Sequence, residues 1–344
     1  MPVSRRLLLA APAAAALQPG HAEAQAPQTL RIGMSLNDVP RLWGGPEAGF
    51  EGLRFGAYLL YDSLVLWDLS RADGPSGLAP GLATDWRVDP ADRRRWIITL
   101  RPGVRFHDNT PFDADAAIWN LDSIFNTAAP QFEGLRAGLV RTRLSSLASY
   151  EKLEDGRIAI TTREPDGMFP FQLTFLFFAS PTQWRALGGD WGRFLAAPVG
   201  TGPYRFAALV PRQRAELEAN ADYWDRARVP KVGRLALLPI PDGSARVAAL
   251  RSGQIDIAET LPPDVIPTLR ANRFQVVQNP YPHIWAWRLN VEPGSPFHDL
   301  RVRQAANLAV DREGMVAMLQ GSALAALGKV TPDDPWFGAP GFRL

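Results

Sequence analysis

The run of residues 169–178 (FPFQLTFLFF) is strongly apolar and contains no charged side chain. Exposing such a run to water is unfavourable, so it must be buried within its own domain or against a partner. The chain has 344 residues, 46% of them hydrophobic, which is enough for a large core and for more than one domain. We therefore expect a globular protein that buries this run.

The hydrophobic pattern predicts a mixture of strands and helices. Strands are predicted over residues 29–36, 95–100, 104–107, 157–162 and 283–290. Helices are predicted within residues 55–64 leading into a strand, after an Asp113 N-cap, over residues 245–251, and as a pair within residues 300–320. Strict alternation of strand and helix is missing, which indicates a mixed α and β class (α+β). The tight segment GTGPY at residues 200–204 predicts a passage between two domains.

Charge and cysteine content exclude several classes of protein. The 37 Lys+Arg residues nearly balance the 35 Asp+Glu residues, leaving a formal net charge of +2. This balance offers no electrostatic footprint for nucleic acid, so no nucleic-acid partner is expected. The chain has no cysteine, which excludes disulfides, thiolate metal sites, a cysteine nucleophile and a lipid-modified N-terminal cysteine.

The first 24 residues have the pattern of an export signal. Arg5 and Arg6 precede the apolar stretch 7–17, and Ala22-Glu23-Ala24 provides a small-residue cleavage site before Gln25. The apolar stretch is too short to span a bilayer, which needs about 20 residues. We expect a soluble periplasmic protein without an anchor, and the paired arginines fit either the general secretory or the twin-arginine route.

No catalytic or metal-binding constellation is evident. The four histidines are His21, His107, His283 and His298, and no two have the spacing that places two imidazoles on one helical face. Nucleophile-elbow, P-loop and dinucleotide-binding patterns are missing as well. Paired carboxylates, such as Asp89 and Asp92, occupy turns or helix starts, where capping and solvation explain them. We expect no catalytic residue, no metal and no cofactor.

Aromatic residues give the stronger functional signal, with 11 Trp, 17 Phe and 6 Tyr. In the strand predicted over residues 283–290, the two-residue period places His283, Trp285 and Trp287 on one face. Two interpretations stay open at this point. The two tryptophans pack in a core, or they line a cleft that binds a small molecule.

Several segments carry a family resemblance, in the family's order. They are YDSL at 61–64, WIITLRPGVRFHDNTPFDADAAIWN at 96–120, PVGTGPYRF at 198–206, RVAALRSGQIDIAE at 246–259 and SPFHDLRVRQAANLAVDREGMV at 295–316. Together they resemble the extracytoplasmic solute-binding proteins of family 5, which serve ABC importers of peptides, nickel and opines (cluster C). Where the family pattern has Gly, this chain has Asn109, which also tolerates the left-handed conformation.

The resemblance implies a periplasmic-binding-protein-like type II fold with three lobes. Lobe I would comprise residues 27–60 and 198–288, lobe II residues 61–197, and lobe III would begin at 289. Family members continue well beyond this point, so the third lobe is expected to be incomplete at residue 344. Its apolar helix positions, such as Leu308 and Met315, are then expected to be exposed.

The resemblance also implies a function. The protein would be a monomer that closes its lobes on a peptide or a similar small solute and delivers it to an ABC permease and its ATPase subunits. The segment around Phe177 lacks the arginine that nickel-type relatives often have there, which disfavours nickel and favours an apolar or peptide-like solute. A secreted peptide-binding chaperone or a chemoreceptor-type protein is the alternative, and a hydrolase is disfavoured. The expected ligand-binding residues are Asn37, Asp38, Trp43, Phe132, Phe177, Tyr281, His283, Trp285 and Trp287.

Overall fold

The computed structural model describes residues 28–71, 76–278, 284–328, 330–332, 334 and 337–338. The predicted export signal and two of the expected ligand-binding residues, Tyr281 and His283, lie outside these ranges.

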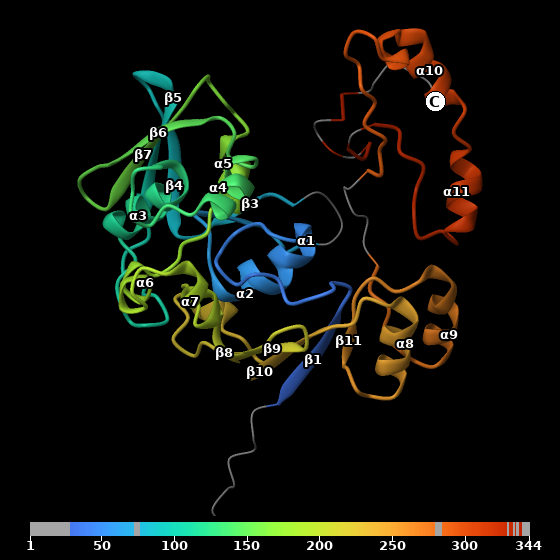
Figure 1. Cartoon of the computed structure of the whole chain (residues 1–344), viewed down its shortest axis with the longest axis horizontal. Helices are drawn as coiled ribbons and strands as arrows, with labels where there is room; N and C mark the ends of the chain where they lie inside the picture. Colours follow the sequence, from blue (N-terminus) through green and yellow to red (C-terminus); the bar gives the residue numbers. More distant parts are fainter. Residues whose placement is uncertain are drawn as a thin grey trace, which may run out of the picture.

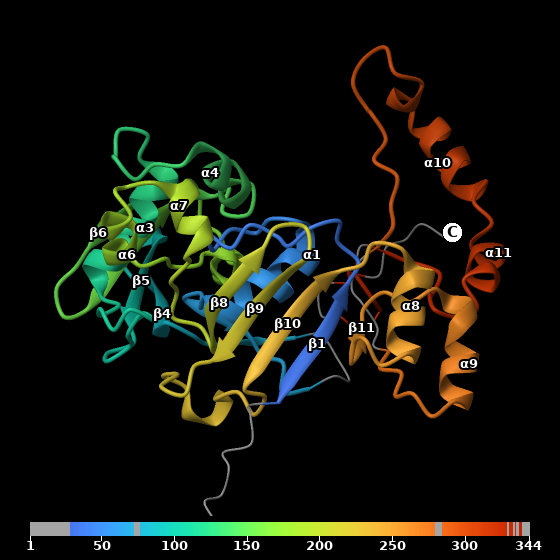
Figure 2. The ribbon, with the colours of Figure 1, turned by 60° about the horizontal axis from the view of Figure 1, so that its bottom comes forward.

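A five-stranded sheet forms one half of the molecule (Figure 2), in the order β11-β1-β10-β9-β8. Its strands are β1 (Thr29–Met34), β8 (Tyr204–Val210), β9 (Arg214–Ala219), β10 (Arg234–Pro239) and β11 (Ile257–Ala258). The first strand is parallel to both β10 and β11, whereas β9 is antiparallel to its two neighbours. The strand predicted at the start of the mature chain is confirmed, and it pairs with a segment about 200 residues away.

A four-stranded antiparallel sheet forms the other half, in the order β4-β5-β7-β6. Its strands are β4 (Ala83–Asp89), β5 (Asp92–Leu100), β6 (Leu147–Lys152) and β7 (Arg157–Thr162), and beside it β2 (Val65–Trp67) pairs with β3 (Leu78–Pro80). The strands predicted at 95–100 and 157–162 are confirmed. The one predicted at 104–107 is reduced to a single bridge between Arg105 and Pro111, and Asn109 has the expected left-handed φ of 66°.

The helices are short, and most of them accompany the two halves. They are α1 (Gly49–Gly52), the π-helix Leu53–Ala57, α2 (Tyr58–Leu60), α3 (Ala114–Phe125), α4 (Gly134–Arg141), α5 (Phe169–Gln172), α6 (Pro181–Ala186), α7 (Trp191–Ala196), α8 (Gly243–Arg251), α9 (Ile266–Ala271), α10 (Leu300–Leu308) and α11 (Arg312–Met318), with 3-10 turns at Leu173–Phe175, Arg226–Arg228, Pro263–Val265 and Pro296–His298. Asp113 caps α3, accepting a hydrogen bond from the Ala116 amide at 2.9 Å. The helices predicted at 245–251 and within 300–320 are confirmed.

Each sheet has its own hydrophobic core, and the run 169–178 contributes to both. Phe169, Leu173, Leu176 and Phe178 are fully buried beside the four-stranded sheet, whereas Phe177 belongs to the core of the five-stranded sheet. The prediction that this run is buried is confirmed, and its burial is within this chain. The run therefore joins the two cores.

The two halves are also joined by two neighbouring chain segments, at residues 60–63 and 199–203, which we together call the crossing. A Cβ on Gly200 would lie 2.1 Å from the Leu60 carbonyl oxygen, and one on Gly202 would lie 2.4 Å from the Leu60 carbonyl carbon. Only glycine allows the backbones to approach so closely. The lobe boundaries predicted at 60/61 and 197/198 fall at this crossing, and the division into lobes stays a prediction.

The carboxylate of Asp62 accepts three side-chain hydrogen bonds at the crossing. The donors are the Tyr223 hydroxyl at 2.7 Å, the Trp224 indole N–H at 2.8 Å and the Thr201 hydroxyl at 2.9 Å. Burial raises the pKa of Asp62, and these three donors act in the opposite direction. The side chain of His107 also contacts the crossing, because its Nε2 lies 2.9 Å from the Gly202 carbonyl oxygen.

Residues 284–328 contrast with both halves. Figure 1 shows that the chain leaves the five-stranded sheet and continues into α10 and α11, which stand apart from the remaining ribbon. Neither helix has a buried residue. The strand predicted over 283–290 is wrong for the described residues 284–290, which form no strand. Period-two patterning alone does not make a strand, because the backbone also needs a paired neighbour to satisfy its N–H and C=O groups.

Candidate functional site

The carboxyl ends of the three parallel strands β10, β1 and β11 meet at one edge of the five-stranded sheet. In open α/β sheets, ligands bind outside the carboxyl ends of the strands. Ile240, Ser35 and Glu259 are the residues that directly follow these three strands. This edge is the candidate functional site.

A buried guanidinium holds the backbone of the edge in place. Arg246, on α8, donates to the carbonyl oxygens of Ile240 at 2.5 Å, Pro241 at 2.8 Å, Glu259 at 2.9 Å and Thr260 at 2.6 Å. Its donors thereby satisfy carbonyl groups after both β10 and β11. The strand ends are thus fixed relative to one another, as a preorganised binding edge requires.

Three charged side chains lie at this edge together with Ser35. Glu51 of α1 accepts a hydrogen bond from the Ser35 hydroxyl, and Arg54 of the π-helix forms an ion pair with Glu259. The Glu259 side chain is only 9% exposed, and its Oε2 atom is buried without a hydrogen-bond donor. Burial raises the pKa of Glu259 to about 7, with Arg54 opposing the shift and Glu51 adding to it.

Sequence reasoning missed this cluster. Glu51, Arg54 and Ser35 carried no motif, and Glu259 appeared only as the last residue of a family segment. The position of these residues could have revealed the cluster, because polar residues that directly follow parallel strands gather at one edge of a sheet. That argument needs the pairing of β1 with β11, which are about 220 residues apart.

Two of the predicted ligand-binding residues, Asn37 and Asp38, lie just beyond Ser35 and are exposed. Asp38 also has a structural contact, because its Oδ1 accepts from the amide of Arg212 at 2.8 Å and so holds the turn between β8 and β9. Their place beside the edge agrees with the expected cleft, although ligand binding by either residue stays a prediction.

The other predicted aromatic residues of the two halves are buried or half-buried. Trp43 is 3% exposed and stacks beneath Arg41. Phe177 is fully buried, with its ring in edge contact with Tyr58 at 5.4 Å. Phe132 is half-buried against the core of the four-stranded sheet. The structure does not bring these three side chains to the edge with Asn37 and Asp38.

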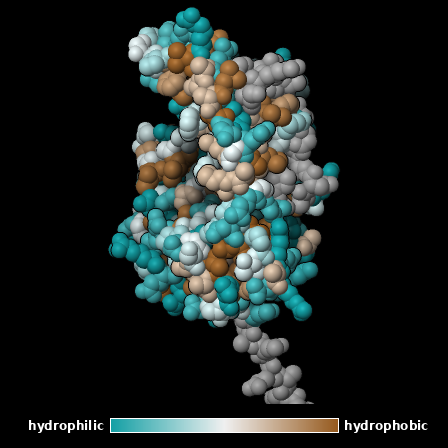
Figure 3. All heavy atoms as spheres, turned by 90° about the vertical axis from the view of Figure 1, so that its right-hand side faces the viewer, coloured by the Kyte–Doolittle hydropathy of each residue, from teal (hydrophilic) through white to brown (hydrophobic). Residues whose placement is uncertain are grey.

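The side chains of Trp285 and Trp287, in contrast, are exposed to solvent, with exposed fractions of 97% and 74%. The interpretation that they pack in a core is therefore wrong. Apolar side chains of α10 and α11 are exposed as well (Figure 3), and brown spheres gather on the upper part of the face that these helices form. Exposure of Leu308 and Met315, expected from the sequence, is confirmed.

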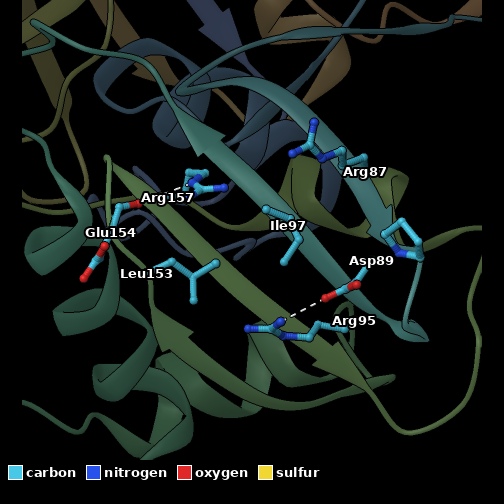
Figure 4. A pocket seen from close by; sticks show the side chains of 8 residues that line it. Arg87, Asp89, Arg95, Ile97, Leu153, Glu154 and Arg157 are labelled. Carbon is cyan, nitrogen blue, oxygen red and sulfur yellow. Dashed lines mark hydrogen bonds and ion pairs between the residues drawn. The ribbon is translucent and has the colours of Figure 1, made fainter.

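A shallow cavity of about 390 Å³ lies elsewhere, on the outer face of the four-stranded sheet. Figure 4 shows Arg87, Arg95 and Arg157 around the aliphatic side chain of Ile97. Arg95 is neutralised by Asp89 at 2.9 Å and by Glu151 at 2.6 Å. Because its charges are largely paired internally, this cavity is a weaker candidate than the strand edge.

The described part of the chain contains neither a membrane-spanning helix nor a cluster of metal ligands. No helix there is long and apolar enough to cross a membrane, and no group of three or more His, Cys, Asp or Glu side chains there could hold a metal ion.

Known proteins resemble this chain in sequence and in fold. Residues 77–342 match the profile of "Bacterial extracellular solute-binding proteins, family 5 Middle". The glutathione-binding protein GsiB of Salmonella typhi is 30% identical over 256 residues, covering 71% of this chain and 48% of that protein. The probable di/tripeptide-binding protein 5 of Pseudomonas aeruginosa is 29% identical over 296 residues, covering 81% of this chain and 55% of that protein.

Among solved structures, the periplasmic binding protein DppA from Helicobacter pylori, in complex with the peptide STSA, matches with a TM-score of 0.70 at 23% identity. The match covers 89% of this chain and 60% of that one, and it shows a shared fold. The chain spans about half the length of the curated relatives that it matches. Because the family profile matches well over half of its residues, the chain belongs to the bacterial extracellular solute-binding proteins of family 5, with their periplasmic-binding-protein-like type II fold.

Proposed function

We propose that this protein is the substrate-binding subunit of an ABC importer, a monomer that captures peptides or similar small solutes between its lobes. The closed form would then deliver the solute to a permease and its ATPase subunits. Membership of the solute-binding family supports this proposal, as do relatives named for binding glutathione or di- and tripeptides.

The observation that carries the proposal is the polar edge at the carboxyl ends of β1, β10 and β11. The edge is held rigid by Arg246 and bears Ser35, Glu51, Arg54 and Glu259. A fixed set of donors and acceptors of this kind suits a solute that is recognised through polar groups.

We include Asn37, Asp38, Trp285 and Trp287 in the proposed solute contacts because all four side chains are exposed. Phe132 is a secondary candidate, since it is half-buried. Trp43 and Phe177 offer almost no surface to a solute in this structure, so we leave them out. Tyr281 and His283 stay predictions from the sequence alone.

Calorimetry on the purified protein with a mixture of di- to pentapeptides tests the proposal. Replacing Trp285 or Trp287 by Ala should remove aromatic contact worth about 1–3 kcal/mol, which weakens binding by about 5- to 150-fold. Because both indoles are exposed, the melting temperature should stay unchanged. Leu324→Ala, at an equally exposed position, is the control. Absence of peptide binding by the wild type would overturn the proposed function, and unchanged affinity in both variants would remove the tryptophans from the site.

The proposed location is the periplasm, reached after removal of residues 1–24 by either the general secretory or the twin-arginine route. Two arginines, an apolar stretch and a small-residue cleavage site support it. N-terminal sequencing of the protein from a periplasmic fraction should give a start near Gln25. Recovery of protein that still begins at Met1 would contradict export.

A further inference from the structure

We propose that His107, Arg205 and Asn220 are positioning residues that hold the two halves of the molecule in one fixed orientation before a solute arrives. They do so through a closed circuit of hydrogen bonds that includes the Gly202 carbonyl group. The effect of this circuit on solute affinity rests on the proposed function, whereas its effect on the orientation of the halves does not.

The carbonyl oxygen of Gly202, at the crossing, contacts a side-chain nitrogen from each half. His107 Nε2, from the loop between β5 and α3, lies 2.9 Å from this oxygen. Asn220, directly after β9, donates to it from Nδ2 at 3.1 Å. A carbonyl oxygen has two lone pairs and no proton, so both nitrogen atoms must be donors. One oxygen atom of the crossing therefore connects the four-stranded half to the five-stranded half.

The partners of His107 determine its tautomer. Because Nε2 donates to Gly202, Nδ1 accepts, and the Gly200 amide donates to it at 3.4 Å. Burial lowers the pKa of His107 to about 4, and Arg205 acts in the same direction. The Gly202 carbonyl group and Asp108 oppose this shift. The imidazole is therefore neutral at pH 7, with one donor and one acceptor nitrogen, as its two contacts with the crossing require.

Arg205, on β8, closes the circuit. Its Nη1 donates to the backbone carbonyl oxygen of His107 at 3.1 Å, and its Nε and Nη2 donate to Asn220 Oδ1 at 3.1 and 2.9 Å. The planar guanidinium fixes the directions of these bonds, which the flexible ammonium group of a lysine would not. Each of the four residues thus contacts two others. A rotation of one half against the other must therefore break or stretch at least one bond.

A fixed orientation of the halves favours binding through pre-organisation. The strand edge with Ser35 and Glu259 belongs to the five-stranded half, whereas Phe132 packs against the core of the four-stranded half. A solute that contacts both halves binds only the molecules in which they are correctly oriented, so the apparent Kd rises as that fraction falls. Loss of the circuit should therefore slow association. Dissociation should stay unchanged, because the contacts of the bound state are retained.

Distances between spin labels on the two halves test the orientation directly. The chain has no cysteine, so Glu154→Cys and Gln213→Cys, at exposed positions of the four-stranded and five-stranded halves, provide unique labelling sites. We expect one narrow distance distribution in this background. Asn220→Ala should replace it by a broad one, and so should Arg205→Met, which serves alone if Asn220→Ala does not fold. Asp222→Ala is the matched control, because it removes only the ion pair of Arg205 with an exposed carboxylate, at 3.5 Å.

Binding kinetics test the consequence for the solute. Stopped-flow fluorescence is measured with the peptide that binds the wild type most tightly among a set of di- to pentapeptides. Arg205→Met and Asn220→Ala should each weaken binding about tenfold, the equivalent of one lost hydrogen bond. The whole loss should appear as slower association, whereas the loss of a direct solute contact would appear as faster dissociation.

The outcomes separate the two proposals. A narrow distribution that persists in both variants overturns the positioning role, and so does equal broadening in Asp222→Ala. Unchanged affinity, or a loss that appears only as faster dissociation, overturns the link to solute binding. If no peptide binds to the wild type, the proposed function fails, whereas the label distances still decide whether the circuit fixes the orientation of the halves.

Discussion

The described residues within 28–278 and those within 284–328 have the same helix-capping signals but differ in how their helices pack. Asp113 caps α3, and Asp299 and Asp311 cap α10 and α11, each through a side-chain hydrogen bond to a backbone amide. On α3, seven residues are buried, whereas α10 and α11 have none. Capping and propensity therefore determine where a helix begins, but only tertiary burial makes it costly to disturb.

Among the substitutions considered, replacing Asp62 at the crossing should lower the stability of the protein most. Asp62→Ala leaves three buried or partly buried donors without this acceptor, so we expect the free energy of unfolding to fall by about 3–5 kcal/mol. Asp115→Ala is the control, because Asp115 forms an exposed ion pair with Lys152 and should cost less than about 1 kcal/mol. Urea unfolding of both variants measures the difference. Similar losses would mean that the crossing is not the cooperative link between the two sheets.

The close backbone approach at the crossing predicts the next effect. Gly202→Ala places a Cβ 2.4 Å from the Leu60 carbonyl carbon, which should lower stability by about 3 kcal/mol as the two segments separate. Gly138→Ala, in α4 with no atom within 4 Å of the new Cβ, should instead raise stability by about 0.5–1 kcal/mol. Thermal melts would refute the comparison if the two substitutions changed stability in the same direction.

Acid should weaken the crossing through His107. Burial lowers the pKa of His107 to about 4, whereas in the unfolded chain it is about 6.5. The unfolded state therefore binds more protons, so this contribution is fully present above pH 6.5 and is lost as the pH falls through 4. We expect about 3 kcal/mol of acid destabilisation over this range. In His107→Gln the pH dependence of the melting temperature should be shallower there; an unchanged slope would exclude His107 as its source.

The smallest effects are expected in residues 284–328. Leu308→Ala and Met318→Ala remove side chains that are 60% and 72% exposed, so each should change stability by less than about 0.5 kcal/mol. Leu121→Ala, at a fully buried position of α3, should cost about 2–5 kcal/mol. Denaturation of the three variants in parallel checks this contrast. A large loss at Leu308 would show that α10 is packed against other parts of the protein in solution.

Local patterns in the sequence predicted only part of the fold, because strands such as β8, β9 and β10 were not among the predicted elements. Residues 157–162 formed the predicted strand, and Asp113 capped the predicted helix. The strand expected at 283–290 failed because its formation depends on a partner that no local pattern reveals. The cluster of Ser35, Glu51, Arg54 and Glu259 was missed for the same reason, since long-range pairing assembles it. Asn37 and Asp38 were placed near it because they follow a strand that the sequence did predict.

The parallel pairing of β1 with β10 also determines when this edge can form during synthesis. Thr29 pairs with Arg234, so 205 residues separate the two partners along the chain. At about 5–20 residues per second, a ribosome needs roughly 10–40 seconds to extend the chain from the first strand to its partner. During that time β1 has neither β10 nor β11 beside it, because both are made later. The emerging chain therefore stays incompletely folded at its amino-terminal end until most of the described protein has been translated.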